Sequence, residues 1–426
     1  MYNIISKPLS LVLIINVLQK LFSYSIFFLL AYFLSNKDYG LFETIFSIGT
    51  FGVMVFGLQA ESAFARYYYL EKENKTINKA IFNTILIFLF GGFLFFLFLN
   101  ILNHNVVELD YPYISSYLLL FFLVNSCYGI LLIHLRFEAF FEKYIALILY
   151  EICSFFILLV ILYTRNLLSI EYLLMIFSLP KLSILIYTLF DNFTLNSFSI
   201  SFETIKKYLK YSINIVPVVM ISFGIILFSR IIVLNNFDPL VLSSYSMGLR
   251  ISMAYLFLNE VFRFMVDPVM IKKERTEDIK PALTELFNNY TKLLLLFNIM
   301  MIGIYYFLNT FLLSFKFEDL NLFIPFLFFS NFLNVLINYF LLINNLYYKT
   351  INNFIAFFIG SIVFLLSFYF FELNILNLLI SLLLFYFSTF IAILFLSQRI
   401  FFLKYNFYYL YISLTVLLIF LVSNFA

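Results

Sequence analysis

The stretch LSNKDYGLF, residues 34 to 42, joins two long apolar segments, and it returns in altered form as LNNFDPLVLSSY, residues 234 to 245. Three residues match at a spacing of 200 positions: Leu34 with Leu234, Asn36 with Asn236 and Asp38 with Asp238. After an insertion of three residues, Gly40-Leu41-Phe42 aligns with Ser243-Ser244-Tyr245. Both copies connect neighbouring apolar segments in the same order, so we expect two tandem halves of similar build.

The composition around these copies is that of a membrane protein. Of the 426 residues, 64% are hydrophobic and only 12% are charged, and the mean hydropathy is +1.02, which is far outside the usage of soluble domains. A net charge of +3 predicts no strongly basic surface, so nucleic acid is not an expected partner. Cys127 and Cys153 lie in apolar runs without disulfide or zinc-site spacing, and we interpret them as small core residues.

A helix that crosses a bilayer needs about 20 mostly apolar residues. Segments of this kind lie at about 8–34, 40–64, 80–102, 114–134, 144–163, 170–190, 211–234, 240–266, 284–308, 322–344, 351–371, 374–397 and 407–424. Together with the repeat, they predict an all-α integral membrane protein of two six-helix bundles, related by pseudo-twofold symmetry around a central cavity. The expected lobes are residues 1–200 and 201–400, and residues 401–426 would add a thirteenth, C-terminal helix.

The connections between these segments predict the orientation, because Lys and Arg accumulate on the cytoplasmic side of a membrane. With a cytoplasmic N-terminus, only Lys37, Arg165 and Lys316 fall on the outer side, whereas most of the other loop cations fall inside. The inner connection at 191–210 contains FETIKKYLK, which predicts an amphipathic helix at the interface. The bias toward Phe, Ile, Asn and Lys is typical of an AT-rich genome, so we expect a multi-pass protein of a bacterial cytoplasmic (inner) membrane.

Charged residues inside the predicted spans are the first candidates for function, since such groups usually face a bundle interior or a hydrated cavity. The basic ones are Lys20, Lys181, Arg230, Arg250, Arg263 and Lys292. Asn16, Gln19 and Lys20 share one helical face. Either the cations line a path for an anionic substrate, or they pair with the acids Glu43, Glu61, Glu151 and Glu260. For Arg230, near the outer end of its span, snorkelling to the interface is a third alternative.

Amides form a second polar pattern, because Asn331, Asn334 and Asn338 lie on one face of the segment at 322–344. Hydrogen bonds between helices are one explanation, and contacts with the hydroxyl groups of a sugar are the other. Enzyme signatures are not found in the sequence: His104 and His134 have no further metal ligand at suitable spacing, and no phosphate-binding glycine motif is present. We therefore expect no catalytic residues, no metal and no cofactor.

The chain resembles the polysaccharide-repeat flippases of the multidrug/oligosaccharidyl-lipid/polysaccharide exporter superfamily, which translocate O-antigen units and related lipid-linked oligosaccharides. The resemblance runs over nearly the whole length and rests on five stretches: LSNKDYGLFE from Leu34, ESAFARYYYLE from Glu61, LRFEAFFEKYIAL from Leu135, LKYSINIVPVVM from Leu209 and IPFLFFSNFLNVLINYF from Ile324. Many members carry an Asp-Arg pair where this chain has Ser229-Arg230. The acid is missing, so the resemblance leaves Arg230 without its neutralising neighbour.

This resemblance implies twelve core helices, a cavity between two lobes and a cationic lining that meets the phosphates of a polyprenyl-diphosphate-linked glycan. We expect phosphate contacts from Lys20, Arg230 and Arg250 first and from Lys181 and Lys292 second, because Arg grips phosphate bidentately. Asn16, Gln19 and the stripe of Asn331, Asn334 and Asn338 would contact sugar hydroxyls, and Glu43 and Glu151 are candidates for ion coupling. Membrane lipids and other polysaccharide-assembly proteins are further expected partners.

The predicted function is therefore a flippase that moves lipid-linked oligosaccharide repeat units to the outer leaflet by alternating access. Three alternatives remain open at this point. An ion-coupled drug/cation antiporter of the same superfamily would favour an acidic cavity, because its substrates are mostly positive. A glycan polymerase or acyltransferase would need a large outer loop or an intramembrane His, and a passive scaffold would move no substrate.

Overall fold

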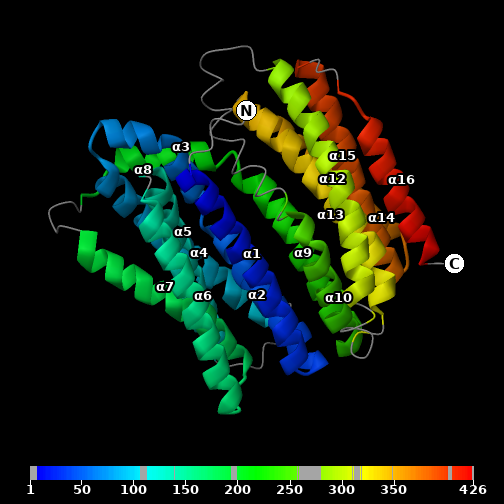
Figure 1. Cartoon of the computed structure of the whole chain (residues 1–426), viewed down its shortest axis with the longest axis horizontal. Helices are drawn as coiled ribbons and strands as arrows, with labels where there is room; N and C mark the ends of the chain where they lie inside the picture. Colours follow the sequence, from blue (N-terminus) through cyan, green and yellow to red (C-terminus); the bar gives the residue numbers. More distant parts are fainter. Residues whose placement is uncertain are drawn as a thin grey trace. The chain divides into compact units, whose positions relative to one another are not determined.

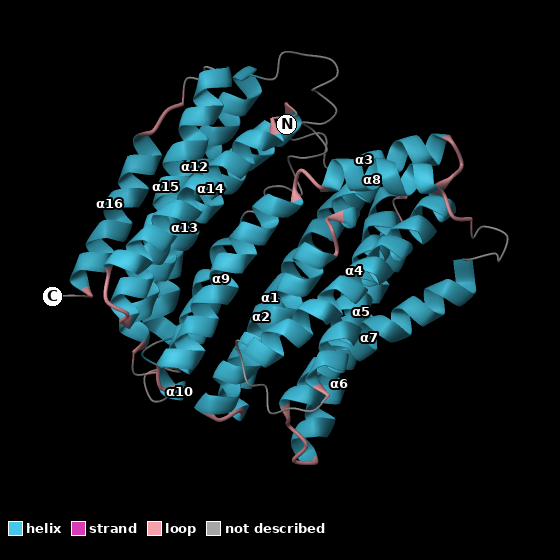
Figure 2. Cartoon of the chain, turned by 180° about the vertical axis from the view of Figure 1, so that it is seen from behind, coloured by secondary structure: helices cyan, strands magenta, loops and turns pink. Residues whose placement is uncertain are grey.

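The structure is a computed structural model that describes residues 7–105, 113–138, 140–192, 199–256, 258, 280–308, 310, 317, 319–347, 349–401 and 405–424. Every predicted apolar segment contains a helix, and the described residues include no strand (Figure 2). The first half contains α1 (Lys7–Phe33), α2 (Asn36–Phe56), α3 (Ala60–Glu73), α4 (Ile77–Asn105), α5 (Ile114–Phe137), α6 (Phe141–Thr164), α7 (Ile170–Asn192) and α8 (Phe202–Ser212). The second contains α9 (Val216–Asn236), α10 (Pro239–Ser252), α12 (Lys280–Leu308), α13 (Leu320–Leu346), α14 (Thr350–Phe370), α15 (Ile375–Phe401) and α16 (Tyr408–Ser423).

Most of these helices have the length and apolarity of membrane spans. Within the described residues, ten helices are long and apolar enough to cross a bilayer, which confirms the prediction of an all-helical, multi-span membrane protein. The additional C-terminal helix at 407–424 is found as α16, which packs against α12 and α13. Its 16 residues correspond to about 24 Å of helix.

The second predicted span, 40–64, is wrong at its C-terminal end. Helix α2 ends at Phe56, and Leu58 and Gln59 follow with φ angles of 51° and 52°, in the left-handed region that stops a helix. Glu61, expected inside this span, instead belongs to the first turn of α3, which is not among the membrane-spanning helices. The predicted span 240–266 contains α10, which ends at Ser252. Residues 254–256 and 258 are helical as well, and residues 259–266 lie outside the described residues.

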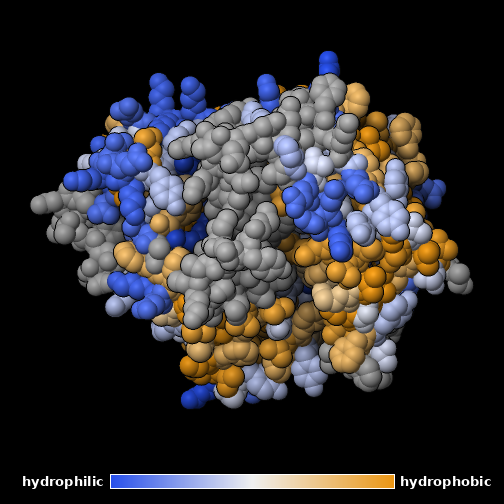
Figure 3. Space-filling model, turned by 45° about the horizontal axis from the view of Figure 1, so that its top comes forward, coloured by the Kyte–Doolittle hydropathy of each residue, from blue (hydrophilic) through white to orange (hydrophobic). Residues whose placement is uncertain are grey.

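Helices α3 and α8 form a polar platform across the end of α4 and α5 (Figure 1). Ser201 caps α8 by accepting the N–H of Thr204, and the buried faces of α3 and α8 contribute Phe64, Tyr68 and Tyr208 to one apolar cluster. Lys207 pairs with Glu71 across the two helices at 3.0 Å. Hydrophilic side chains gather over this end of the protein (Figure 3). The amphipathic helix predicted in the connection at 191–210 is thereby confirmed.

The two copies of the repeat each begin a helix, but they do so with different residues. Ser35, directly before α2, accepts the N–H of Asp38 at 3.1 Å, whereas Asp238 itself caps α10 by accepting the N–H of Leu240 at 2.8 Å. Counted from Ser35 and Asp238, α2 and α10 are related by a shift of 203 residues. This is the register expected after the three-residue insertion, so Gly40 and Ser243 occupy corresponding turns.

The helices form two compact units. One consists of Met1–Ile26 and Leu41–Ile231, and the other of Phe27–Gly40 and Ile232–Ala426. In the second unit α13 is the central helix, because α10, α14, α15 and α16 all pack against it. In the first unit α5 has that role, with α3, α4, α6 and α7 around it. These contacts do not test the symmetry between the halves, and the division into lobes at residue 200 stays a prediction.

Candidate functional site

The most buried charges of the first unit are Arg230 on α9 and Glu43 on α2. The Nη1 atom of Arg230 donates to Oε2 of Glu43 at 3.0 Å, and both side chains have no exposed surface. Arg230 therefore does not snorkel, although it lies near the end of its helix. The acid is missing next to Arg230 in the sequence, but Glu43, 187 residues away, takes its place, so of the alternatives for Arg230 the structure shows the ion pair.

One edge of the Arg230 guanidinium has no acceptor. Its Nε and Nη2 atoms are buried and without a hydrogen-bond partner among the described residues. These two nitrogens are the adjacent donors that grip an oxyanion side-on with two parallel hydrogen bonds. Glu43 accepts from the third nitrogen, and no described group accepts a hydrogen bond from this edge. The two nitrogens therefore keep the hydrogen-bonding capacity for a carboxylate or phosphate group, although the side chain is fully buried.

A second polar cluster lies in the first unit, where α1, α5, α6 and α7 meet. Oε2 of Glu151 accepts from the hydroxyl of Tyr128 at 2.9 Å and from Nε2 of Gln19 at 3.2 Å. The Nζ atom of Lys181 lies 3.5 Å from Oε1 of Glu151 and donates to Oδ1 of Asn125 at 2.6 Å. Lys181, expected to contact phosphate, and Glu151, expected to couple an ion, are thus partners of one another.

Asn125 and Tyr128 are members of this cluster that were not among the candidate residues predicted from the sequence. The signal for Asn125 was its position, since it is an amide near the middle of an otherwise apolar span. Tyr128 carries no such signal, because the chain contains 32 tyrosines and no pattern in the sequence distinguishes this one. The cluster draws its members from four separate helices, so helical periodicity connects only Asn125 with Tyr128, which lie three residues apart on α5.

In the second unit, the candidate residues are dispersed. The guanidinium of Arg250 lies 3.5 Å from the ring centroid of Phe27, which gives it a cation–π contact. Asn331 donates to Oγ of Ser252 on α10 at 2.9 Å, and Asn338 donates to the backbone oxygen of Asn334 at 2.9 Å. The amide stripe thus contributes an interhelical hydrogen bond and a local one. Lys292 is exposed on α12.

Four of the residues singled out from the sequence are not placed by the structure. Asn16 and Lys20 belong to α1, but their side chains lie outside the described part of the chain. Arg263 and Glu260, which belong to the charged residues of the predicted spans, also lie outside the described residues. Among the residues that are described, no group of three or more His, Cys, Asp or Glu side chains is arranged to hold a metal ion.

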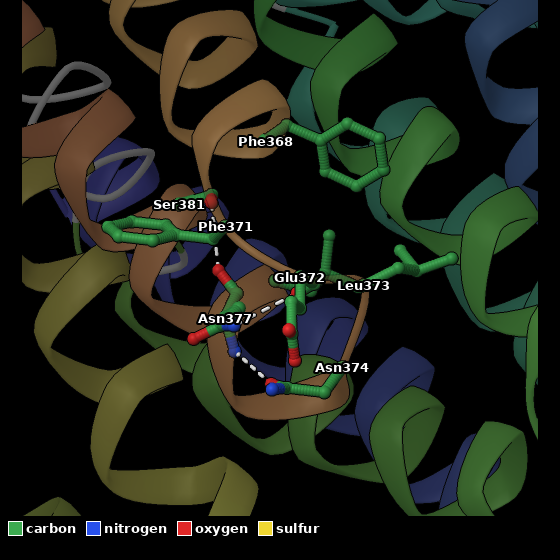
Figure 4. Close-up of a pocket in the computed structure, with 8 residues that line it drawn as sticks. Phe368, Phe371, Glu372, Leu373, Asn374, Asn377 and Ser381 are labelled. Atoms are coloured by element: carbon green, nitrogen blue, oxygen red, sulfur yellow. Dashed lines mark hydrogen bonds between the residues drawn. The ribbon is translucent and has the colours of Figure 1, made fainter.

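A small hollow lies at the turn between α14 and α15 (Figure 4). Its polar groups bond to one another: the N–H of Asn377 donates to Oδ1 of Asn374 at 2.8 Å, and Nδ2 of Asn377 donates to the backbone oxygen of Glu372 at 2.9 Å. These contacts begin α15 in the manner of a helix cap. We interpret the hollow as part of that turn rather than as a ligand site.

Comparison with known proteins gives the fold but no family. No family model matches the sequence, and no curated protein matches it. Among solved structures, an inward-facing multidrug resistance MATE-family transporter of the MOP superfamily aligns with a TM-score of 0.67 at 12% identity, over 91% of this chain and 98% of that one. The chain has the MOP-superfamily fold.

Two further structures of the same fold extend this similarity. An outward-facing MATE-family transporter aligns with a TM-score of 0.63 at 12% identity, over 94% of this chain and 96% of that one. The lipid II flippase MurJ, in an inward closed conformation, aligns with a TM-score of 0.61 at 17% identity, over 97% of each chain. At these identities the likeness concerns the fold, and the MOP fold hosts both drug transporters and a lipid flippase.

Proposed function

We propose that this protein is a flippase of the bacterial cytoplasmic membrane. It would move polyprenyl-diphosphate-linked oligosaccharide units, such as O-antigen repeats, from the cytoplasmic to the outer leaflet, with its N-terminus in the cytoplasm. Alternating access of two lobes to the two sides of the membrane would carry the headgroup across. The polyprenyl tail can remain in the lipid during this movement.

The observation that carries the proposal is the unpaired edge of Arg230. A buried donor without an acceptor costs about 1–3 kcal/mol, and more when the group is charged. The phosphate of a lipid-linked sugar supplies two oxygens in the geometry that Nε and Nη2 require. A diphosphate in hydrocarbon would itself face a penalty of tens of kcal/mol. Binding would therefore supply the missing acceptors to Arg230 and would also spare the diphosphate its contact with hydrocarbon.

A drug/cation antiporter is the second candidate, and the high TM-score with MATE-family transporters favours it. Its cationic substrates would need an acidic site. In the first unit, Glu43 and Glu151 are acids that lie inside predicted spans. Glu43 is bonded to Arg230 and Glu151 to Lys181. A cationic drug would have to displace Arg230 or Lys181, whereas an anion would leave the Arg230–Glu43 bond intact. Because this pair is fully buried, the anion would reach Arg230 only when the alternating-access movement opens the site.

The test is transport in liposomes that contain the purified protein and a fluorescent polyprenyl-diphosphate sugar. We expect the labelled headgroup to become accessible to a membrane-impermeant quencher on the opposite leaflet, at a rate proportional to protein content. Arg230→Gln should lower the rate at least about tenfold, equivalent to 1.4 kcal/mol of lost binding. Arg165→Gln, at an exposed arginine directly after α6, is the matched control and should be unaffected.

Two results would contradict the proposal. One is a flipping rate in protein-containing liposomes that equals the rate in empty ones. The other is pumping of a cationic dye against its gradient, with no movement of the lipid-linked sugar, which would favour the antiporter.

A further inference from the structure

We propose that the ammonium group of Lys181 is a tethered cation, which fills a monovalent-cation site built by Glu151, Asn125, Tyr128 and Gln19. The first unit would thereby carry its own positive charge in place of a bound metal cation. The ammonium group would balance the charge of Glu151 in the first unit whatever cargo the protein moves.

The ligands of this site are the kinds of groups that hold a hard cation. Around Nζ of Lys181 lie a carboxylate oxygen of Glu151 at 3.5 Å and the amide oxygen of Asn125 at 2.6 Å. The ring of Tyr128 has its centroid 5.7 Å from the same nitrogen. Carboxylate and amide oxygens are preferred by hard metal cations, and an aromatic face adds attraction for any positive charge.

Two hydrogen bonds to the second oxygen of Glu151, Oε2, fix the carboxylate in this position. It accepts hydrogen bonds from the hydroxyl of Tyr128 and from the amide of Gln19. Because the carboxylate is held by two helices other than its own, removal of the ammonium should leave its Oε1 atom and Oδ1 of Asn125 facing the same small volume.

The cluster is also open enough for exchange. The side chains of Lys181 and Glu151 keep 17% and 18% of their surface exposed, whereas those of Arg230 and Glu43 keep none. A small ion from solution can therefore reach the place of the ammonium. The Arg230–Glu43 pair offers no such access, and we do not assign it this role.

The experiment compares purified Lys181→Ala, Lys181→Ala/Glu151→Gln and unchanged protein by thermal unfolding in detergent. Each is measured in chloride salts of sodium, methylammonium and choline at equal ionic strength. Methylammonium reproduces the lost ammonium group, and choline is too large for the site. If Lys181→Ala is not recovered, Lys181→Gln takes its place, because it also removes the charge but keeps a donor for Asn125.

We expect the single variant to unfold at the lowest temperature in choline and to be stabilised by sodium or methylammonium. Above saturation, its Tm should rise on the order of 2 °C for each tenfold increase in cation. The unchanged protein and the double variant should not distinguish the three salts. The inference is wrong if the single variant has one Tm in all three, because Lys181 and Glu151 are then only a structural ion pair, or if sodium stabilises the unchanged protein equally.

Discussion

The Glu43–Arg230 pair allows structural and functional contributions of a buried charge to be measured separately. The perturbations are Glu43→Gln, Arg230→Met and the double variant. Both side chains are fully buried with one 3.0 Å hydrogen bond between them. Removing one partner leaves the other charge buried without compensation, which costs about 3–5 kcal/mol. Replacing both removes the two desolvation penalties together, so the double variant should return close to the stability of the unchanged protein.

The assay has two arms, thermal unfolding in detergent and flipping of the lipid-linked sugar in liposomes. We expect both single variants to unfold at clearly lower temperatures and the double variant to recover most of the loss. The coupling energy of the cycle should be at least about 2 kcal/mol. Transport should follow a different pattern, since both variants without Arg230 lose it, including the stable double variant.

Two outcomes would refute this reasoning. If the stable double variant transports at the unchanged rate, Arg230 contributes only charge balance to Glu43 and is not a phosphate ligand. If the effects of the single variants on stability add up in the double variant, the pair is not energetically coupled, and the buried ion pair is not the source of the stability.

Two other predictions concern stability. Burial raises the pKa of Glu61 from 4.5 to about 7, so between these values the folded protein holds a proton that the unfolded chain releases, and stability falls as the pH rises through that window. Glu61→Gln should therefore raise the Tm at pH 8 but not near pH 5, and an equal effect at both pH values would show that Glu61 does not titrate in this range. For Gly360→Ala in α14, the new Cβ would collide with Oγ1 of Thr389, whereas Gly303 in α12 has nothing within 4 Å of a Cβ. We expect Gly360→Ala to cost about 1–3 kcal/mol and Gly303→Ala to be neutral or stabilising by up to about 1 kcal/mol; equal Tm values for the two variants would contradict the close packing of α14 on α15.

The sequence was sufficient to locate the helices, because a bilayer requires every backbone group of a span to be bonded within its own helix. Apolar length alone therefore located the long apolar helices, whereas α8 was indicated by its amphipathic pattern and α3 was not separated from α2. It was not sufficient for the break between α2 and α3, since a left-handed conformation at Leu58 and Gln59 has no sequence signal at those residues. Because of that break, Glu61 lies in the platform helix α3 and not in the predicted span.

The sequence was enough to predict which charged residues form the candidate site, but not which of them bond to one another. Charge inside an apolar segment was enough to single out Arg230, Glu43, Lys181 and Glu151. Their pairing required tertiary structure, because Arg230 and Glu43 lie 187 positions apart on helices whose mutual packing no local pattern specifies. The sequence predicts ion coupling for both acids, whereas the structure bonds each of them to a cation that is predicted to contact phosphate.

These two pairs differ in a way that bears on function. At Lys181 and Glu151, both oxygens of the carboxylate and the ammonium have partners within the cluster. At Arg230, the carboxylate neutralises the charge but meets only one of the three guanidinium nitrogens. The Arg230–Glu43 pair has no net charge, but two of its N–H donors have no described acceptor. It therefore favours a ligand that supplies oxygen atoms as acceptors. Because Glu43 already balances the charge of Arg230, such a ligand would be held mainly by hydrogen bonds and less by net attraction. That is a suitable condition for the proposed flippase, which would have to release on one side of the membrane the phosphate that it bound on the other.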